Sequence, residues 1–121
     1  MNICIDLGNT ISTPLKKCDA PYNEVMACKV ISGAAKVIRK WHKEGHRIII
    51  FTHRSSYLKD CTAEWLRKHK IPYTELRMEK PDYDILIDDK GLKFKDWKII
   101  EDTLVIPELL EEDNKTKRED I

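Results

Sequence analysis

Short apolar runs, each followed by a polar residue, recur along the chain. The runs are "NICI" before Asp6, "RIIIF" before Thr52 and "DILI" before Asp88. All three are rich in β-branched residues, which is typical of strands that are buried on both faces of a sheet. The pattern therefore predicts three strands, each with a polar residue at its carboxyl end.

Between these runs, apolar residues recur at helical spacing in two segments. They are Ala34, Val37, Ile38 and Trp41 in the first segment, and Leu58, Cys61, Trp65 and Leu66 in the second. Gly45 is a suitable stop for the first helix, and Ser55 or Ser56 is a suitable cap for the second. The alternation of strand and helix predicts an α/β fold with a mainly parallel sheet and right-handed crossovers.

Two further segments, "IPYTEL" (71–76) and "TLVI" (103–106), are candidate strands. Residues 11–31 form a long polar connection between the first strand and the first helix, too short for a second domain. We therefore expect one domain over residues 1–107. The charged, non-periodic residues 108–121 are expected to be a disordered tail.

Composition narrows the classes of partner. The 121 residues include 22 basic and 21 acidic side chains, so net charge predicts neither nucleic-acid binding nor a membrane-binding surface. The four cysteines are scattered, without metal-ligand spacing. We interpret them as reduced thiols in a cytoplasmic protein, with a Cys18–Cys28 disulfide as the alternative. No leader segment or membrane-spanning apolar run is recognised in the sequence.

The polar strand ends form a candidate site, because ligands of open parallel sheets bind where the strands end. Asp6, Thr52 and the Asp88–Asp89 pair all fall there. Carboxylates from two strand ends can share Mg²⁺, which would allow a phosphate to approach. Thr52 can donate a hydrogen bond to a phosphate oxygen, and Lys80 can neutralise charge that develops during phosphoryl transfer.

The order of these residues resembles the four motifs of the haloacid dehalogenase-like (HAD-like) hydrolases. The motifs are Asp6-x-x-x-Thr10, Thr52, Lys80 and Asp88-Asp89, and the resemblance spans roughly residues 2–100. The stretches "KWHKEGHRIIIFTHR" and "EWLRKHKIPYTEL" and residues 79–97 are similar to small capless members associated with capsular polysaccharide biosynthesis. The resemblance implies a Rossmann-like three-layer α/β/α sandwich without a cap domain.

The resemblance also implies a role for each motif residue. Asp6 would be the nucleophile and a Mg²⁺ ligand, with Lys80 assisting catalysis. The expected phosphate-binding residues are Leu7, Gly8, Thr52, His53 and Lys80. The expected metal ligands are Asp6, the carbonyl of Gly8, Asp88 and Asp89, and either of the two adjacent aspartates could bind the metal directly.

Gly8 departs from the family pattern. Phosphatases of this family carry a second aspartate at this position, which protonates the leaving group and then activates water. General acid–base assistance contributes about 10²–10⁴-fold to a rate. Turnover should therefore be impaired unless another group replaces the acid. His53 is one candidate surrogate base, and a solvent-facing histidine without a catalytic role is the alternative.

Other conspicuous side chains have structural interpretations. Trp41 and Trp65 are expected in the core, whereas the position of Trp97 stays open. Tyr22 is a candidate for the site entrance. Arg54, Lys90 and Lys93 are interpreted either as contacts to a phosphorylated substrate or as ordinary solvated cations. His42, His46 and His69 are not predicted to bind metal.

Three hypotheses follow for function. The first is a slow Mg²⁺-dependent phosphate-monoester hydrolase that acts through an aspartyl phosphate. The second is a non-catalytic protein that binds Mg²⁺ and a phosphorylated ligand or partner. The third is a structural α/β domain. An open capless site implies either a large phosphorylated substrate or a lid from another subunit of a homo-oligomer, and the sequence leaves the substrate's identity open.

Overall fold

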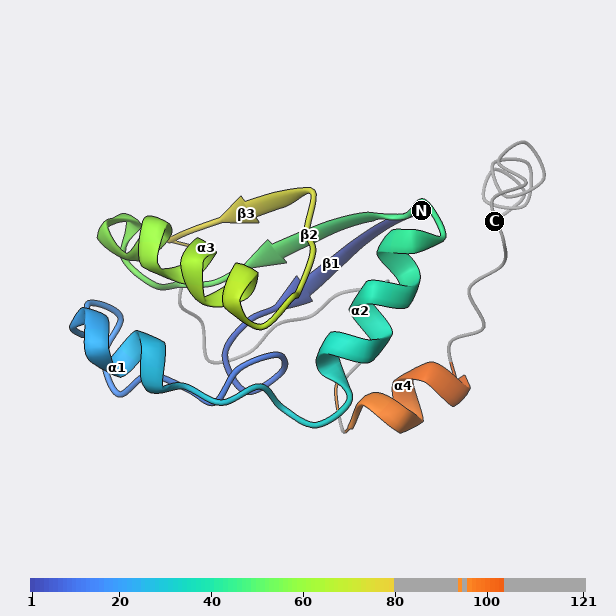
Figure 1. Cartoon of the computed structure of the whole chain (residues 1–121), viewed down its shortest axis with the longest axis horizontal. Helices are drawn as coiled ribbons and strands as arrows, with labels where there is room; N and C mark the ends of the chain where they lie inside the picture. The colour runs from blue at the N-terminus through green and yellow to red at the C-terminus, as the bar shows by residue number, and fades with distance from the viewer. Residues whose placement is uncertain (80–93, 95, 104–121) are drawn as a thin grey trace, which may run out of the picture.

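The computed structural model describes residues 1–79, 94 and 96–103. Its elements, in chain order, are β1 (Asn2–Asp6), α1 (Tyr22–Ala27), α2 (Ala34–Lys43), β2 (Arg47–Phe51), the 3₁₀ turn η1 (Ser56–Leu58), α3 (Lys59–Lys68), β3 (Glu75–Arg77) and α4 (Trp97–Thr103) (Figure 1). The predicted alternation of strand and helix is confirmed as far as β3. The predicted strand before Asp88 lies outside the described residues.

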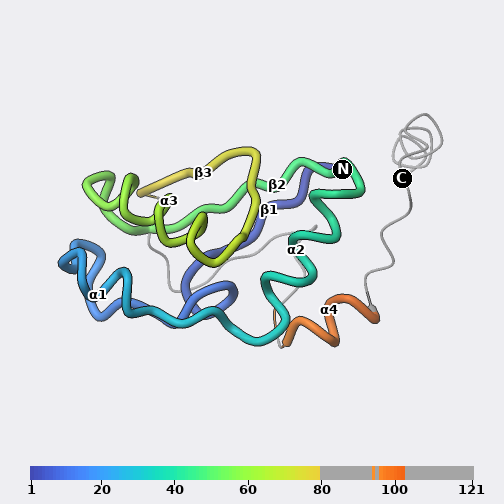
Figure 2. Tube along the Cα trace, viewed as in Figure 1, coloured from blue at the N-terminus to red at the C-terminus, as the bar shows by residue number. Residues whose placement is uncertain are grey.

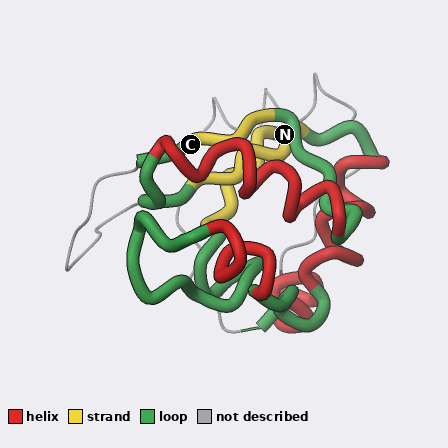
Figure 3. Tube along the Cα trace, turned by 60° about the vertical axis from the view of Figure 1, so that its left-hand side comes forward, coloured by secondary structure: helices red, strands yellow, loops and turns green. Residues whose placement is uncertain are grey.

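The strands form a parallel sheet in the order β1-β2-β3. Helices α2 and α3 connect neighbouring strands in the same direction, so right-handed crossovers place both helices on one face of the sheet. Figure 3 shows the strands gathered on one side of the molecule and the helices on the other. The α/β class and the mainly parallel sheet are therefore confirmed.

The core lies between the sheet and this helical layer. Ile5, Ile48 and Ile50 project from the strands into one cluster of buried side chains that also contains Trp41 and Trp65. The isoleucines share one face of the sheet because every second side chain of a strand points to the same face. Trp41 and Trp65 face the sheet because of their helical spacing, and the prediction that both are core residues is confirmed.

The connection between β1 and α2 contains more structure than its polar sequence predicts. Figure 2 follows this segment through α1 and along the helical layer to α2. Backbone pairing holds its two ends together, since the Thr13 amide donates to the Lys29 carbonyl at 2.9 Å. Helix α1 has only six residues. Periodicity cannot reveal so short a helix, because fewer than two turns carry too few apolar positions.

Helix α1 is held against α3 by a side-chain contact. The Tyr22 hydroxyl donates to Glu64 Oε1 at 2.9 Å, and Trp65 Nε1 donates to the Cys28 carbonyl just beyond α1 at 2.9 Å. Tyr22 is itself exposed. Its contact with α3 gives it a structural role, and its predicted place at a site entrance stays a prediction.

Several sequence predictions change in detail. The strand predicted within 71–76 is Glu75–Arg77, because the preceding residues end α3 and turn. The strand predicted from Thr103 is wrong at its first residue, which ends α4 instead. Residues 104–106 and the predicted tail, 108–121, lie outside the described residues. The four cysteines are free, so Cys18 and Cys28 are not bridged. No helix within the described ranges is long and apolar enough to cross a membrane.

The two crossover helices end in the same motif. After α2, the Gly45 amide donates to His42 and the His46 amide to Trp41, and Gly45 is left-handed with φ 94°. After α3, the amides of Lys70 and Ile71 make the corresponding bonds, and Lys70 is left-handed with φ 56°. These paired bonds satisfy the last carbonyls of each helix. The predicted stop at Gly45 is confirmed.

His46 should make the stability of the fold dependent on pH. Its side chain is 3% exposed, and burial lowers the pKa of the imidazole below its ordinary value of 6.5. Between the lowered pKa and 6.5 the unfolded chain therefore binds more protons than the folded chain. The free energy of unfolding should be highest above 6.5 and should fall as the pH drops through this window.

Urea unfolding between about pH 8 and about pH 5 checks this expectation. A His46→Phe variant, which keeps an aromatic ring, should show a smaller fall than the parent. An equal fall in the parent and in His46→Phe would contradict the assignment.

Candidate active site

The register of the sheet brings two predicted site residues to neighbouring strand ends. Asp6 ends β1 and lies opposite Phe51 in β2, and Thr52 follows Phe51 directly. The Thr52 amide donates to the Arg77 carbonyl at 3.0 Å, which extends the pairing to β3. Thr52 is only 2% exposed. The backbone of both residues is therefore fixed by the sheet.

The loop after Asp6 is a tight turn built around one carbonyl. The Leu7 carbonyl accepts hydrogen bonds from the amides of Thr10, Ile11 and Ser12 at 3.4, 2.9 and 2.9 Å. Asn9 adopts the left-handed conformation, φ 62°, that asparagine tolerates better than most residues. Asn9 therefore lets the chain turn sharply straight after the strand end.

Leu7 is occupied by the fold itself. Its side chain is buried in the core, and its amide donates to the Phe51 carbonyl at 3.1 Å. A phosphate contact by the Leu7 amide would have to share or replace that sheet hydrogen bond. Phosphate binding by Leu7 stays a prediction, and it would weaken the hydrogen bond between the Leu7 amide and the Phe51 carbonyl.

Gly8 leaves room for the side chain that it lacks. A Cβ atom built on Gly8 would meet no atom of the described residues within 4 Å. Among the described glycines, only Gly33 and Gly45 have positive φ, so the backbone of Gly8 is not in the conformation that excludes other residues. No atom of the described residues therefore obstructs a side chain at this position where it would leave the backbone.

Helix α4 reaches this loop from far along the chain. Trp97 is 3% exposed, and its Nε1 donates to the Thr10 carbonyl at 2.7 Å. The ring also packs against Trp41, with the ring centroids 5.9 Å apart. Gly33, at the start of α2, allows this approach, because a Cβ on it would lie 2.9 Å from the Cβ of Trp97. The position of Trp97, left open by the sequence, is thus structural.

The turn after Thr52 keeps the Thr52 hydroxyl available as a donor. The Arg54 amide donates to Thr52 Oγ1 at 3.2 Å. Because this oxygen accepts from the backbone, its own hydrogen can still be donated to an incoming phosphate oxygen. His53 lies between the two and is exposed. Its place beside the strand end is compatible with the predicted surrogate base, which stays a prediction.

Arg54 is not the solvated cation that the sequence suggested as one reading. It is 4% exposed, and its guanidinium donates to Thr62 Oγ1 of α3 at 3.1 Å. Burial lowers the pKa of Arg54 from its ordinary value, although a guanidinium stays charged in proteins. Arg54 therefore ties the turn after Thr52 to α3. Apolar periodicity could not predict this contact, because it reports which face of a single element is buried, and Arg54 and Thr62 lie on different elements.

The chain returns to the same strand ends just before Lys80. The Glu79 amide donates to the Arg54 carbonyl at 3.0 Å, and Glu79 is left-handed with φ 57°. The described chain thus runs directly up to Lys80 from beside Thr52. Lys80, Asp88, Asp89, Lys90 and Lys93 lie outside the described residues, so their predicted roles stay predictions.

The donors in the described part of the site suit a hard divalent cation. Asp6 offers a carboxylate and Gly8 a carbonyl, and the Gly8 carbonyl accepts none of the backbone hydrogen bonds of its loop. Mg²⁺ takes oxygen ligands of these kinds and keeps several waters. No group of three histidine, cysteine or acidic side chains in the described ranges could hold a metal ion. The residues fit a Mg²⁺ site that would draw its remaining protein ligands from Asp88 or Asp89.

A family model decides where the chain belongs. The model for the LNS2 domain of PITM 1-3 matches residues 16–103. The chain belongs to this LNS2 domain family. The match begins after the Asp6 loop and includes Thr52 and α4, together with the predicted residues Lys80 and Asp88. No curated protein matches the chain.

Solved structures agree on the fold. A crystal structure of an MCSG target from Vibrio cholerae is 21% identical, with a TM-score of 0.61, over 76% of this chain and 82% of that chain. A chain of the Pnkp1/Rnl/Hen1 complex is 27% identical, with a TM-score of 0.51, over 73% of this chain and 30% of that chain. LNS2 membership and this fold place the chain in the HAD-like superfamily. The narrower likeness to the capsular branch stays a prediction.

The packing of Trp97 on the Asp6 loop can be tested through Gly33. A Gly33→Ala substitution should lower the free energy of unfolding by about 2 to 4 kcal/mol, because the residue has φ 90° and its Cβ would collide with Trp97. Gly8→Ala is the matched control, with an expected cost below about 1 kcal/mol. Equal costs in urea unfolding would contradict the close approach at Gly33.

Proposed function

We propose that the chain is a Mg²⁺-dependent phosphate-monoester hydrolase that acts through an aspartyl phosphate on Asp6. One observation carries the proposal: Asp6 and the hydroxyl of Thr52 lie at adjacent ends of parallel strands, where open α/β sheets bind ligands. Membership of the LNS2 domain family and the HAD-like fold support it.

The chemistry follows from what each residue offers. Asp6 attacks the phosphorus of the ester, a new bond forms between its carboxylate oxygen and phosphorus, and the alcohol oxygen leaves with the bonding electrons and takes up a proton. Water then attacks the aspartyl phosphate, which releases inorganic phosphate and restores Asp6. Thr52 holds the phosphoryl oxygens, and Lys80 balances their charge. Bound Mg²⁺ would neutralise the phosphate as it approaches Asp6.

Gly8 makes this hydrolase slow. The leaving alcohol must take its proton from solvent or from His53, which is exposed next to Thr52. Loss of a positioned acid removes about 10²–10⁴-fold of the rate, equal to roughly 3 to 5 kcal/mol of barrier. The substrate is a phosphorylated small molecule or a larger phosphorylated partner. The chain would act on this substrate either with an open site or with a second subunit covering the site.

The openness of the Gly8 position also favours a second function. A loop that keeps its nucleophile and its carbonyl ligand but lacks its acid is suited to binding Mg²⁺ and a phosphorylated ligand without turnover. The two functions share a site, and they differ in whether phosphate is released.

Replacement of Asp6 tests the first function. The parent should release phosphate from p-nitrophenyl phosphate in the presence of Mg²⁺, and Asp6→Asn should lose at least about 10³-fold of that activity, because the amide cannot form the covalent intermediate. EDTA should abolish release in the parent, and added Mg²⁺ should restore it. Activity that persists in Asp6→Asn or in EDTA would contradict the proposal.

Restoring the acid separates the two functions. A Gly8→Asp substitution should raise kcat by about 10²–10⁴-fold, since the new side chain enters open space and supplies the missing proton transfer. Gly8→Asn is the matched control, because it has the same shape but no acid, and it should leave kcat near the parent value. If both variants and the parent bind Mg²⁺ and beryllofluoride but none releases phosphate, the binding function is favoured over the hydrolase.

A further inference from the structure

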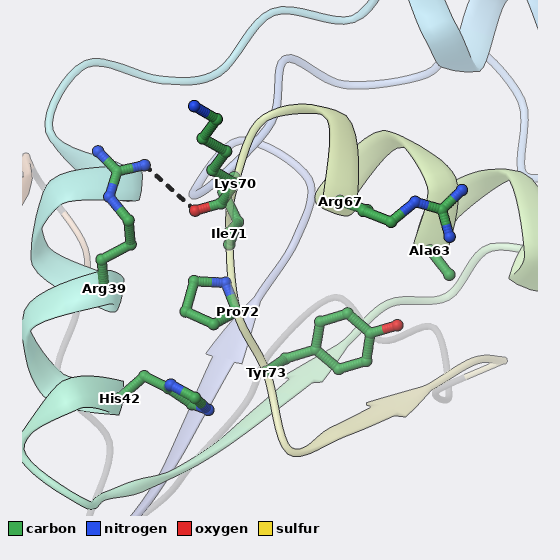
Figure 4. A pocket seen from close by; sticks show the side chains of 8 residues that line it. All are labelled: Arg39, His42, Ala63, Arg67, Lys70, Ile71, Pro72 and Tyr73. Atoms are coloured by element: carbon green, nitrogen blue, oxygen red, sulfur yellow. Dashed lines mark hydrogen bonds between the residues drawn. The ribbon is translucent and has the colours of Figure 1, made fainter.

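A groove of about 520 Å³ lies between α2 and α3, over the segment that leads into β3. We call it the α2–α3 groove and define it by Arg39, His42, Arg67, Lys70, Pro72 and Tyr73. Figure 4 shows Arg39 and His42 on α2 and Arg67 on α3, with the segment from Lys70 to Tyr73 between the two helices. Its volume is in the range of small-molecule sites.

The groove lies away from the candidate active site. His42 is close to the end of α2, which precedes β2, and Lys70 to Tyr73 precede β3. These residues therefore lie toward the amino ends of the strands, whereas Asp6 and Thr52 lie at the carboxyl ends. A ligand in the groove would occupy a second site.

The charges that line the groove have one sign. Arg39, Arg67 and Lys70 are exposed cations, and none of the described residues that line the groove is an aspartate or a glutamate. The net charge of the chain is only +1, so this excess is local. Helix dipoles favour cations in the last turn of a helix, but Arg39 precedes the last turn of α2 and Lys70 lies beyond α3. The dipoles therefore do not account for these two residues.

The backbone of Lys70 carries a second signal. Lys70 and Gly45 occupy the same position of the same helix-ending motif, and both are left-handed. Glycine adopts this conformation freely, whereas a residue with a Cβ is strained by about 1 kcal/mol. After α2 this position is a glycine, which is not strained. After α3 it is Lys70, a cation at the edge of the groove, and its backbone is strained. Retained strain of this kind is typical of functional positions.

The groove is held open in a defined shape. Arg39 donates from one guanidinium nitrogen to the Lys70 carbonyl at 3.1 Å, which fixes this side chain against the segment below it. Further N–H groups of its planar fork remain for a ligand, and such forks match the oxygen atoms of phosphate. Figure 4 shows the Pro72 ring turned toward α2 and the Tyr73 ring toward Arg67. These rings provide flat, apolar surface beside the cations.

We propose that the α2–α3 groove binds a phosphate ester whose organic part is flat, with Arg39 and Lys70 contacting the phosphate and Tyr73 contacting the organic part. The proposal does not depend on hydrolysis at Asp6. A nucleoside monophosphate is the simplest probe that has both a phosphate and a flat organic part. The corresponding nucleoside, which lacks only the phosphate, is the control ligand.

Titration of the ¹⁵N-labelled full chain with AMP tests the proposal. AMP should shift the amide signals of Lys70, Ile71 and Tyr73, both in the parent and in Asp6→Asn, and adenosine should bind at least about fivefold more weakly. Ribose 5-phosphate, which has no base, should also bind more weakly than AMP. Shifts confined to the Asp6 loop and Thr52, or no shifts up to about 10 mM AMP, would overturn the proposal.

Charge variants with matched controls locate the site. Arg39→Gln should raise the Kd for AMP about five- to tenfold, and the exposed Lys36→Gln on the same helix, with the same change of net charge, should alter it by less than about twofold. Lys70→Gly should weaken AMP binding to the same extent as Arg39→Gln but should not lower the Tm, because glycine relieves the left-handed strain. Equal effects of Arg39→Gln and Lys36→Gln, or tight adenosine binding, would overturn the proposal.

Discussion

The parallel pairing of β1 with β2, with Asp6 opposite Phe51, is the constraint on which the rest of the molecule depends. A shift of this register by one residue would turn the core isoleucines to the other face of the sheet. The same register places Asp6 beside Thr52 at one edge. Burial of the isoleucines and placement of the site are therefore fixed by one set of backbone hydrogen bonds, and neither can change without the other.

The two loops at this edge are held by contacts from distant parts of the chain. Trp97 donates to the Asp6 loop from α4, and Arg54 ties the turn after Thr52 to Thr62. Both contacts use a buried polar group with a partner, which is costly to lose because the remaining group would be left without a hydrogen bond. The candidate site is therefore supported by the helical layer as well as by the strands.

The sequence was informative wherever a short-range pattern determined the structure. Apolar runs located β1 and β2, helical spacing located α2 and α3, and Gly45 marked a helix end that the structure confirms. Tertiary contacts left no such pattern. The burial of Arg54 depends on Thr62, and the place of Trp97 depends on the absence of a side chain at Gly33. Predictions for Lys80, Asp88 and Asp89 follow from motif order alone.

The open space at Gly8 has a consequence for how this loop can evolve. Some glycine codons differ from an aspartate codon by a single base, and here neither the backbone conformation nor neighbouring atoms of the described residues oppose the exchange. A loop of this kind can cross between an acid-bearing and an acid-free form in one mutational step, without compensating changes elsewhere. The two forms are therefore neighbours in sequence space.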